Sequence, residues 1–238
     1  MSTYGRARLR TLLALTDEDR TSSMLELIAA RAVTALAVSG AGITVLSHLG
    51  GGAPPRRGLV QATDDTSHRL DAVQLTLEEG PCLEAFRSAA PVLVSDLDTG
   101  GGRWPGFTSC AREAGAAAVF SFPLLVGAVR LGSLDVYRDS AGPLGQQQHG
   151  DALLLAEAAT EALLEEISGH SADGAVWLAD ARTPVHEATG MVAAQLGVTM
   201  DSALLRLRTH AYTSGLPVTA VADQVLGRTL QFSPDSTA

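Results

Sequence analysis

Hydrophobic positions at helical spacing mark the first structured part of the chain. After a polar lead over residues 1–21, apolar residues recur from Ser22 onward at intervals close to 3.6. Ser22 or Ser23 can cap this helix, and Gly40 is expected to end it. Its predicted apolar positions include Met24, Leu27, Ile28, Ala35 and Leu36.

Short apolar runs bounded by glycine and proline predict strands. Two runs, 43–46 and 59–63, flank the turn-forming cluster 50–55 and form a predicted antiparallel pair. This order of elements predicts an α+β domain with a mainly antiparallel central sheet. Further strands are predicted at 91–94, 116–122, 124–126 and 128–137, with helices at 67–76, from Gly80-Pro81 onward, and at 105–113.

A long helix is predicted from Asp151 to Ile167. Part of its apolar set recurs at alternating intervals of three and four, which is the seam pattern of a coiled coil. More apolar residues widen the stripe, so we expect two packing surfaces: its own sheet and a second copy of the chain. Packing only within its own chain is the alternative, because two heptads are few for a coiled coil. The seam comprises Leu153, Ala156, Thr160, Leu163 and Ile167.

The chain changes character after a predicted linker at 169–175. Residues 176–232 predict three short helices, which start near Pro184, Thr199 and Pro217, and Gly197 and Gly215 end the first two. The predicted organisation is therefore a lead (1–21), an α+β domain with its long helix (22–168), the linker, a three-helix domain (176–232) and a tail (233–238).

Composition restricts the classes of function. The net charge is −9 and all 17 basic residues are arginine, which excludes lysine Schiff-base chemistry and lysine-dependent phosphate loops. Two cysteines argue against a disulfide framework and favour a reducing compartment. No signal peptide or membrane-spanning apolar stretch is evident, so we expect a cytoplasmic protein with no membrane partner.

Candidate catalytic and metal sites are weak. Cys82 follows Pro81 at a predicted helix start, where the helix dipole can activate a thiol, but a buried inert cysteine is the favoured interpretation for both Cys82 and Cys110. The six histidines are dispersed, so no metal site is predicted. We therefore expect no catalytic residues, no cofactor and no enzymatic activity.

A small basic cluster stands out in the three-helix region. Four arginines and five acidic residues give residues 176–238 a net charge of −1, which leaves −8 for the rest of the chain. Arg206, Arg208 and His210 share one predicted helix, with Arg206 and His210 four positions apart on one face. Such a cluster can contact phosphate, and an exposed solubilising face is the alternative.

Two known domain families resemble these segments. The run 185–192 (VHEATGMV), the run 203–208 (ALLRLR), Gly197, Pro217 and Val221-Ala222 resemble the ANTAR domain, a three-helix RNA-binding module of bacterial transcription antiterminators. The segment from about Ser22 to Ile167, with LEEGPCLEA at 77–85 and PVLVSDL at 91–97, resembles the GAF sensor domain that precedes ANTAR in many bacteria.

The resemblance implies a dimeric, signal-responsive RNA-binding antitermination regulator that recognises paired RNA hairpin loops. ANTAR helices often carry lysine where this chain has Thr189, so RNA binding would rest on Arg206, Arg208, His210, Arg228 and Gln195. The GAF ligand is unknown: cyclic-nucleotide and bilin signatures are missing, which leaves a small molecule, a protein partner or no ligand. A DNA-binding regulator and a protein-interaction adaptor without nucleic-acid binding are the alternatives.

Overall fold

The computed structural model describes residues 3–14, 22–47, 56–169 and 184–233. Five strands form one sheet in the order β2-β1-β5-β4-β3, and every neighbouring pair is antiparallel. This arrangement confirms the predicted α+β class. The strands are β1 (Gly40–Ser47), β2 (Arg56–Ala62), β3 (Val92–Val94), β4 (Ala118–Val126) and β5 (Val129–Arg138).

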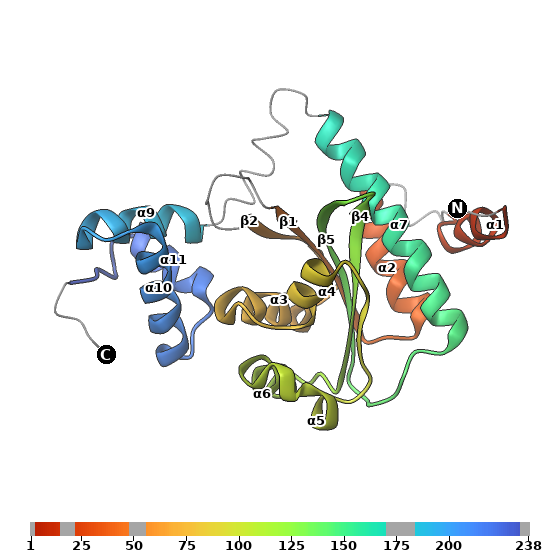
Figure 1. The fold of residues 1–238 in the computed structure, drawn as a ribbon, viewed down its shortest axis with the longest axis horizontal. Coiled ribbons are helices and arrows are strands. Elements are labelled where there is room, and N and C mark those ends of the chain that lie inside the picture. Colours follow the sequence, from red (N-terminus) through yellow and green to blue (C-terminus); the bar gives the residue numbers. More distant parts are fainter. Residues whose placement is uncertain (1–2, 15–21, 48–55, 170–183, 234–238) are drawn as a thin grey trace.

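Helices cover both faces of the sheet (Figure 1). One face packs against α2 (Met24–Leu36) and α7 (Gln146–Gly169), and α3 (Asp65–Leu77) and α4 (Pro81–Ser88) pack against strands from the other side. This domain also contains α5 (Leu97–Gly100), the 3₁₀ turn η2 (Gly101–Arg103) and α6 (Pro105–Glu113).

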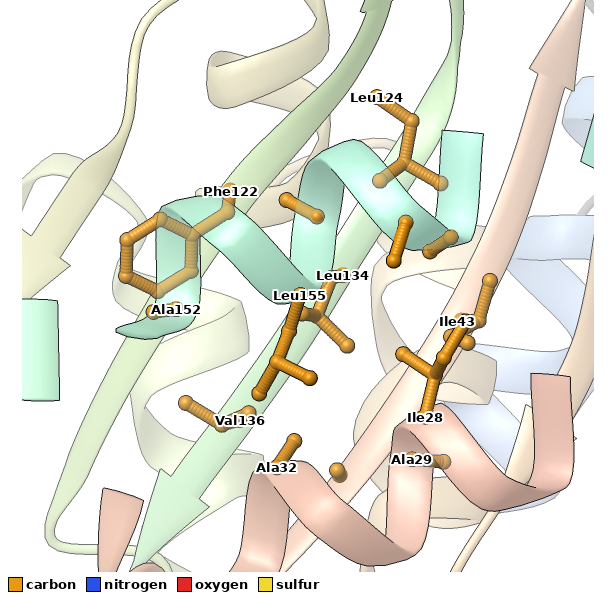
Figure 2. Packing of buried hydrophobic residues seen from close by; sticks show 14 of the residues in the cluster. Ile28, Ala29, Ala32, Ile43, Phe122, Leu124, Leu134, Val136, Ala152 and Leu155 are labelled. Atoms are coloured by element: carbon orange, nitrogen blue, oxygen red, sulfur yellow. The ribbon is translucent and has the colours of Figure 1, made fainter. Parts of the chain in front are cut away.

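The main core lies between the sheet and the pair α2–α7 (Figure 2). Large aliphatic and aromatic side chains of β1, β4 and β5 interlock there with alanines of the two helices, which let the backbones approach closely. Leu155 of α7 projects between the sheet and α2 and is fully buried. Figure 2 labels Ile28, Ala29, Ala32, Ile43, Phe122, Leu124, Leu134, Val136, Ala152 and Leu155.

Two boundaries differ from the sequence expectation. Helix α2 ends at Ala37, which adopts the left-handed conformation (φ 47°), and Gly40 instead opens β1. The two strands expected on either side of Pro123 are one strand, β4. Proline is tolerated inside it because β3 pairs only with Val119–Ser121 of β4, which leaves β4 without a partner on that side at Pro123.

The N-terminal lead contains a helix that the sequence pattern did not single out, α1 (Thr3–Leu12). Leu12 is buried, and Leu9 and Leu13 pack against the main core. Helix α1 contacts α7, which itself starts at Gln146 instead of Asp151. Helix α1 therefore packs on the outer side of the layer formed by α2 and α7.

The predicted seam of α7 packs within its own chain. Ala156 and Leu163 are buried in the main core, and the Thr160 hydroxyl donates to the Ala156 carbonyl at 2.8 Å. Leu153, in contrast, is 44% exposed. Ile167 is half-buried. The surface left for contact with a second copy is thus limited to Leu153 and Ile167, because Ala156, Thr160 and Leu163 are buried within the chain.

Three further helices form a separate domain: α9 (Pro184–Leu196), α10 (Met200–Ser214) and α11 (Val218–Leu226). Their starts and ends match the expectation: Thr199 caps α10 by accepting the Ser202 amide, and Gly215 ends it at φ 65°. Alanines and valines form the core of this domain, which contacts the sheet domain through α3. Most of the predicted linker, 170–175, lies outside the described residues.

Candidate nucleic-acid interface

Helix α10 is the centre of the candidate interface. Its Ala203, Leu207 and Ala211 are fully buried against α9 and α11 because they recur at intervals of four along one face. The polar side chains between them must therefore point outward, in more than one direction around the helix. The five predicted RNA-binding residues are distributed over these outward faces and over the ends of α9 and α11.

Arg206, His210 and Gln195 belong to one side of the domain. Arg206 and His210 are one turn apart on α10 and are both partly exposed. The His210 ring meets Phe232 edge-on, with ring centroids 5.6 Å apart, and the Phe232 amide donates to Gln195 Oε1 at 3.3 Å. The segment after α11 thus links α9 and α10 here and holds an aromatic ring beside the polar groups.

Arg208 lies on a different face of α10, because two residues correspond to about 200° of helical rotation. Its guanidinium is 2.8 Å from the Glu78 carboxylate at the end of α3, and its side chain is only 17% exposed. The structure therefore separates Arg208 from Arg206 and His210. Arg228 is exposed just beyond α11, in the left-handed conformation (φ 57°).

Two aromatic residues that the sequence analysis did not select lie near these polar groups, one on each of the two faces of α10. Tyr212 is 65% exposed on α10, one turn after Arg208, and Phe232 packs on His210. Exposed aromatic rings next to arginine are suited to stacking on unpaired bases. The spacing of Arg208 and Tyr212 was a usable signal in the sequence, whereas the position of Phe232 depends on the path of the chain after α11.

Thr189 is a buried residue of α9. Its side chain is 3% exposed, and its hydroxyl donates to the Val185 carbonyl at 2.6 Å. The hydroxyl is thereby satisfied inside the domain and does not face a ligand. Thr189 therefore adds packing to the domain core and is not available for RNA contact.

The sheet domain contains a small cavity, lined by both apolar and polar side chains, between α3 and the sheet. Its volume is about 20 Å³, which is room for a single water molecule. Thr44 on its wall donates to Asp71 Oδ1 at 2.9 Å. The lining also includes Gly42, Leu59, Ser67, Leu70, Gln74, Val119, Asp135, Val136 and Tyr137.

Asp64 forms a hydrogen-bonded cap at the start of α3. The Ser67 amide (2.8 Å), the Thr63 hydroxyl (2.9 Å) and the Tyr137 hydroxyl (3.2 Å) all donate to its carboxylate. Burial alone would raise the pKa of Asp64, but these hydrogen bonds outweigh it and lower the pKa below its usual value. For Tyr137, burial is the main cause of a raised pKa, and the neighbouring Asp64 carboxylate adds to it.

The cysteines lack the surroundings of a nucleophile. Cys82 is fully buried, its amide donates to Gln74 Oε1, and its Sγ lies 3.0 Å from the Ser133 hydroxyl, which donates to Asp135. Burial raises the pKa of the Cys110 thiol, and the nearby Glu113 and Glu79 add to this. A thiol that stays protonated is a poor nucleophile.

Within the residues that the structure describes, no group of three or more histidine, cysteine or acidic side chains is placed to hold a metal ion. Among the same residues, no helix combines the length and the apolar content needed to cross a bilayer.

Comparisons with known proteins identify one family model and several structures of similar fold. The family model of the ANTAR domain matches residues 179–226, which include α9, α10 and α11. A search of curated protein sequences found no significant match.

Solved structures resemble the chain at low sequence identity. The GAF domain of an Acinetobacter phosphoenolpyruvate-protein phosphotransferase superposes with a TM-score of 0.50 at 14% identity, covering 71% of this chain and 98% of its own. SdiA in complex with octanoyl-rac-glycerol gives a TM-score of 0.51 at 16% identity and covers 95% of this chain and 94% of its own. At such identities the likeness concerns the fold. Residues 179–226 therefore match the ANTAR domain, and they follow a domain whose fold resembles that of GAF domains.

Proposed function

We propose that this protein is an RNA-binding transcription antitermination regulator whose ANTAR domain binds paired RNA hairpin loops under control of the GAF domain. The observation that carries the proposal is the partly exposed basic face of α10 within the matched ANTAR segment, where Arg206 and His210 are one turn apart. Arginine contacts phosphate and histidine can stack or donate a hydrogen bond to a base.

The charge distribution supports an orientation for this binding. The ANTAR region, residues 176–238, carries a net charge of −1, whereas the remainder carries −8. RNA would approach the side of α10 that holds Arg206, His210 and Gln195, since the body of the protein repels a polyanion. Arg228 and Arg208 are the further arginines of the proposed contact.

We also propose that the protein acts as a homodimer, which would place two ANTAR domains opposite two loops. The outer edge of α7 is the proposed contact, because Leu153 remains 44% exposed there and Ile167 is half-buried, while Ala156, Thr160 and Leu163 are buried in their own chain.

The decisive experiment measures binding of the full chain to a synthetic RNA with two adjacent hairpin loops, at low salt. Competing probes are a single hairpin and a DNA duplex of equal length. Arg206→Ala should weaken binding to the two-loop RNA about fivefold or more, because one phosphate or base contact is lost. Arg130→Ala, an exposed arginine of the sheet domain, is the matched control and should leave the affinity unchanged.

The competing probes separate the alternatives. A preference for the DNA duplex over both RNAs at matched salt would support a DNA-binding regulator instead. Absence of binding to all three probes would support a protein-interaction adaptor. Equal affinity of the parent and Arg206→Ala for the two-loop RNA would show that the assigned face of α10 is wrong.

A further inference from the structure

The exposed surface of α3 makes specific contacts with the ANTAR domain. The Glu78 carboxylate, at the end of α3, pairs with Arg208 of α10 at 2.8 Å. Leu75 of α3 packs against the apolar core of the three helices. Figure 1 shows α3 end-on to this domain, with α10 and α11 beside it.

A hydrogen bond between the domains completes a helix end. Pro217 precedes α11 and provides no side-chain cap, so the first amides of α11 need other acceptors. The Val218 amide donates to Thr76 Oγ1 of α3 at 3.2 Å, in a buried position. The same hydroxyl donates to the Ala72 carbonyl at 2.7 Å, so Thr76 serves both domains. A cap supplied from another domain indicates a defined docking position.

We propose that α3 is a docking surface for the chain's own ANTAR domain, and that docking keeps Arg208 from RNA. The inference rests on the proposed RNA-binding function and adds its regulation. In the docked state the Arg208 side chain is 17% exposed and neutralised by Glu78, so it cannot also bind a phosphate. Arg206 remains outside this contact, which makes the docked form a weakened RNA binder and not an inert one.

The docking contact is built to be reversible. A cavity of about 500 Å³ lies beside it, between α3, α6 and the turn after α10, so the two domains are incompletely packed. Glu78 is 49% exposed, and a pair with one solvated partner contributes little binding free energy. Small polar contacts between domains of this kind permit relative motion.

The same helix borders the small cavity of the sheet domain. Leu70, Asp71 and Gln74 of α3 line that cavity, and Thr76 and Glu78 follow them directly toward the ANTAR domain. A ligand or partner that displaces α3 would therefore move Thr76 and Glu78 directly, because these residues belong to the same helix and its end. The docking surface links an input at the sheet domain to the exposure of Arg208.

The experiment opens the contact in the full chain and measures docking and RNA binding separately. Glu78→Gln removes the ion pair at nearly constant shape, and Thr76→Val removes the acceptor of the Val218 amide. Docking is followed by hydrogen exchange at the start of α11, and binding by affinity for the two-loop RNA. Asp139→Asn, which neutralises an exposed carboxylate elsewhere on the sheet domain, controls for net charge.

We expect Glu78→Gln to bind the RNA about two- to fivefold more tightly and to lose protection at Val218, whereas Asp139→Asn changes neither. Arg208→Ala added to Glu78→Gln should remove the gain, because Arg208 is the released contact. Thr76→Val should also lose protection and bind more tightly.

The outcomes distinguish this inference from the proposed function. If Glu78→Gln and Thr76→Val open α11 to exchange but bind RNA with the parent's affinity, docking does not control Arg208 and the inference is overturned while RNA binding stands. Unchanged exchange in both variants would likewise overturn it. If neither parent nor variants bind RNA, the proposed function fails, and the regulation inferred from it fails as well.

Discussion

Arg8 and Asp151, which are 143 positions apart in the chain, form a two-pronged ion pair between α1 and α7. The Arg8 Nε and Nη2 atoms donate to the two Asp151 carboxylate oxygens at 2.8 and 2.7 Å. The Asp151 side chain is 4% exposed, so the pair is largely buried on its acidic side. The carboxylate also raises the pKa of Arg8 through the hydrogen bond between them. The pair attaches the N-terminal helix to the main core.

Removal of Arg8 should destabilise the protein. Arg8→Ala leaves a buried carboxylate without its partner, which costs about 1–3 kcal/mol in the free energy of unfolding since Arg8 itself is 29% exposed. Chemical denaturation followed by circular dichroism measures the change. Arg10→Ala, at an exposed position of the same helix, is the control and should shift the free energy by less than about 0.5 kcal/mol. Equal denaturation midpoints for Arg8→Ala and Arg10→Ala would show that the ion pair does not stabilise the protein.

This pair also illustrates what the sequence could not reveal about the fold. The periodic elements α2, α7, α9, α10 and α11 follow from local spacing and from caps such as Thr199 and Gly215, and they were predictable. Helix α1 was not, because its apolar face is narrow and it depends on a carboxylate far away in the chain. The continuity of β4 through Pro123 likewise depends on where the neighbouring β3 ends.

Gly132 should be irreplaceable, because β5 approaches β1 closely at this position. A Cβ atom built on Gly132 would collide with the backbone carbonyl oxygen of Thr44. Gly132→Ala should therefore destabilise the sheet domain by about 3 kcal/mol. Gly150 provides a matched control: it lies in α7 with nothing within 4 Å of an added Cβ, and Gly150→Ala should stabilise the protein by up to about 1 kcal/mol. Thermal unfolding of both variants tests the contrast.

The lowered pKa of Asp64 predicts an acid-labile stability contribution. The carboxylate is favoured in the folded state, so its contribution is present above the unfolded pKa, about 4, and is lost as the pH falls through the lower folded pKa. The free energy of unfolding of the parent should therefore decrease between about pH 5 and pH 2 more steeply than that of Asp64→Asn. Asp65→Asn, an exposed residue of the same helix turn, should retain the parent's slope. If the stability of Asp64→Asn fell with pH as steeply as that of the parent, the prediction would be contradicted.

Separate substitutions on α7 should distinguish self-association from folding. Leu153→Glu places a charge on the exposed edge and should shift the protein toward monomer in sedimentation experiments, with an unchanged circular dichroism spectrum. Leu163→Glu places the same charge in the fully buried core and should prevent stable folding, since an unpaired buried carboxylate cannot be accommodated. A Leu153→Glu protein with the parent's sedimentation behaviour would exclude this edge as the dimer contact.

The candidate site was only partly predictable from the chain. The four-residue spacing of Arg206 and His210 places both on one helical face whatever surrounds the helix, and the structure has them there. Arg208 could not be assigned in this way, because its surroundings are set by Glu78 of another domain. The contact of His210 with Phe232 depends on the return of the chain after α11. Local periodicity therefore identifies the helix face, and tertiary packing decides which of its charges are available.

Salt dependence should report how many arginines contact RNA. Each phosphate contact that is lost reduces the slope of log affinity against log salt by about 0.7 to 1, so Arg206→Ala should flatten the slope by about that amount. Arg208→Ala should flatten it less in the parent, where Glu78 already neutralises Arg208, than in the Glu78→Gln background, where Arg208 is released. Arg130→Ala should leave the slope unchanged.

Titrations of the two-loop RNA at four salt concentrations, with each variant alone and combined with Glu78→Gln, give the comparison. An identical effect of Arg208→Ala in both backgrounds would show that the ion pair with Glu78 does not restrict this arginine.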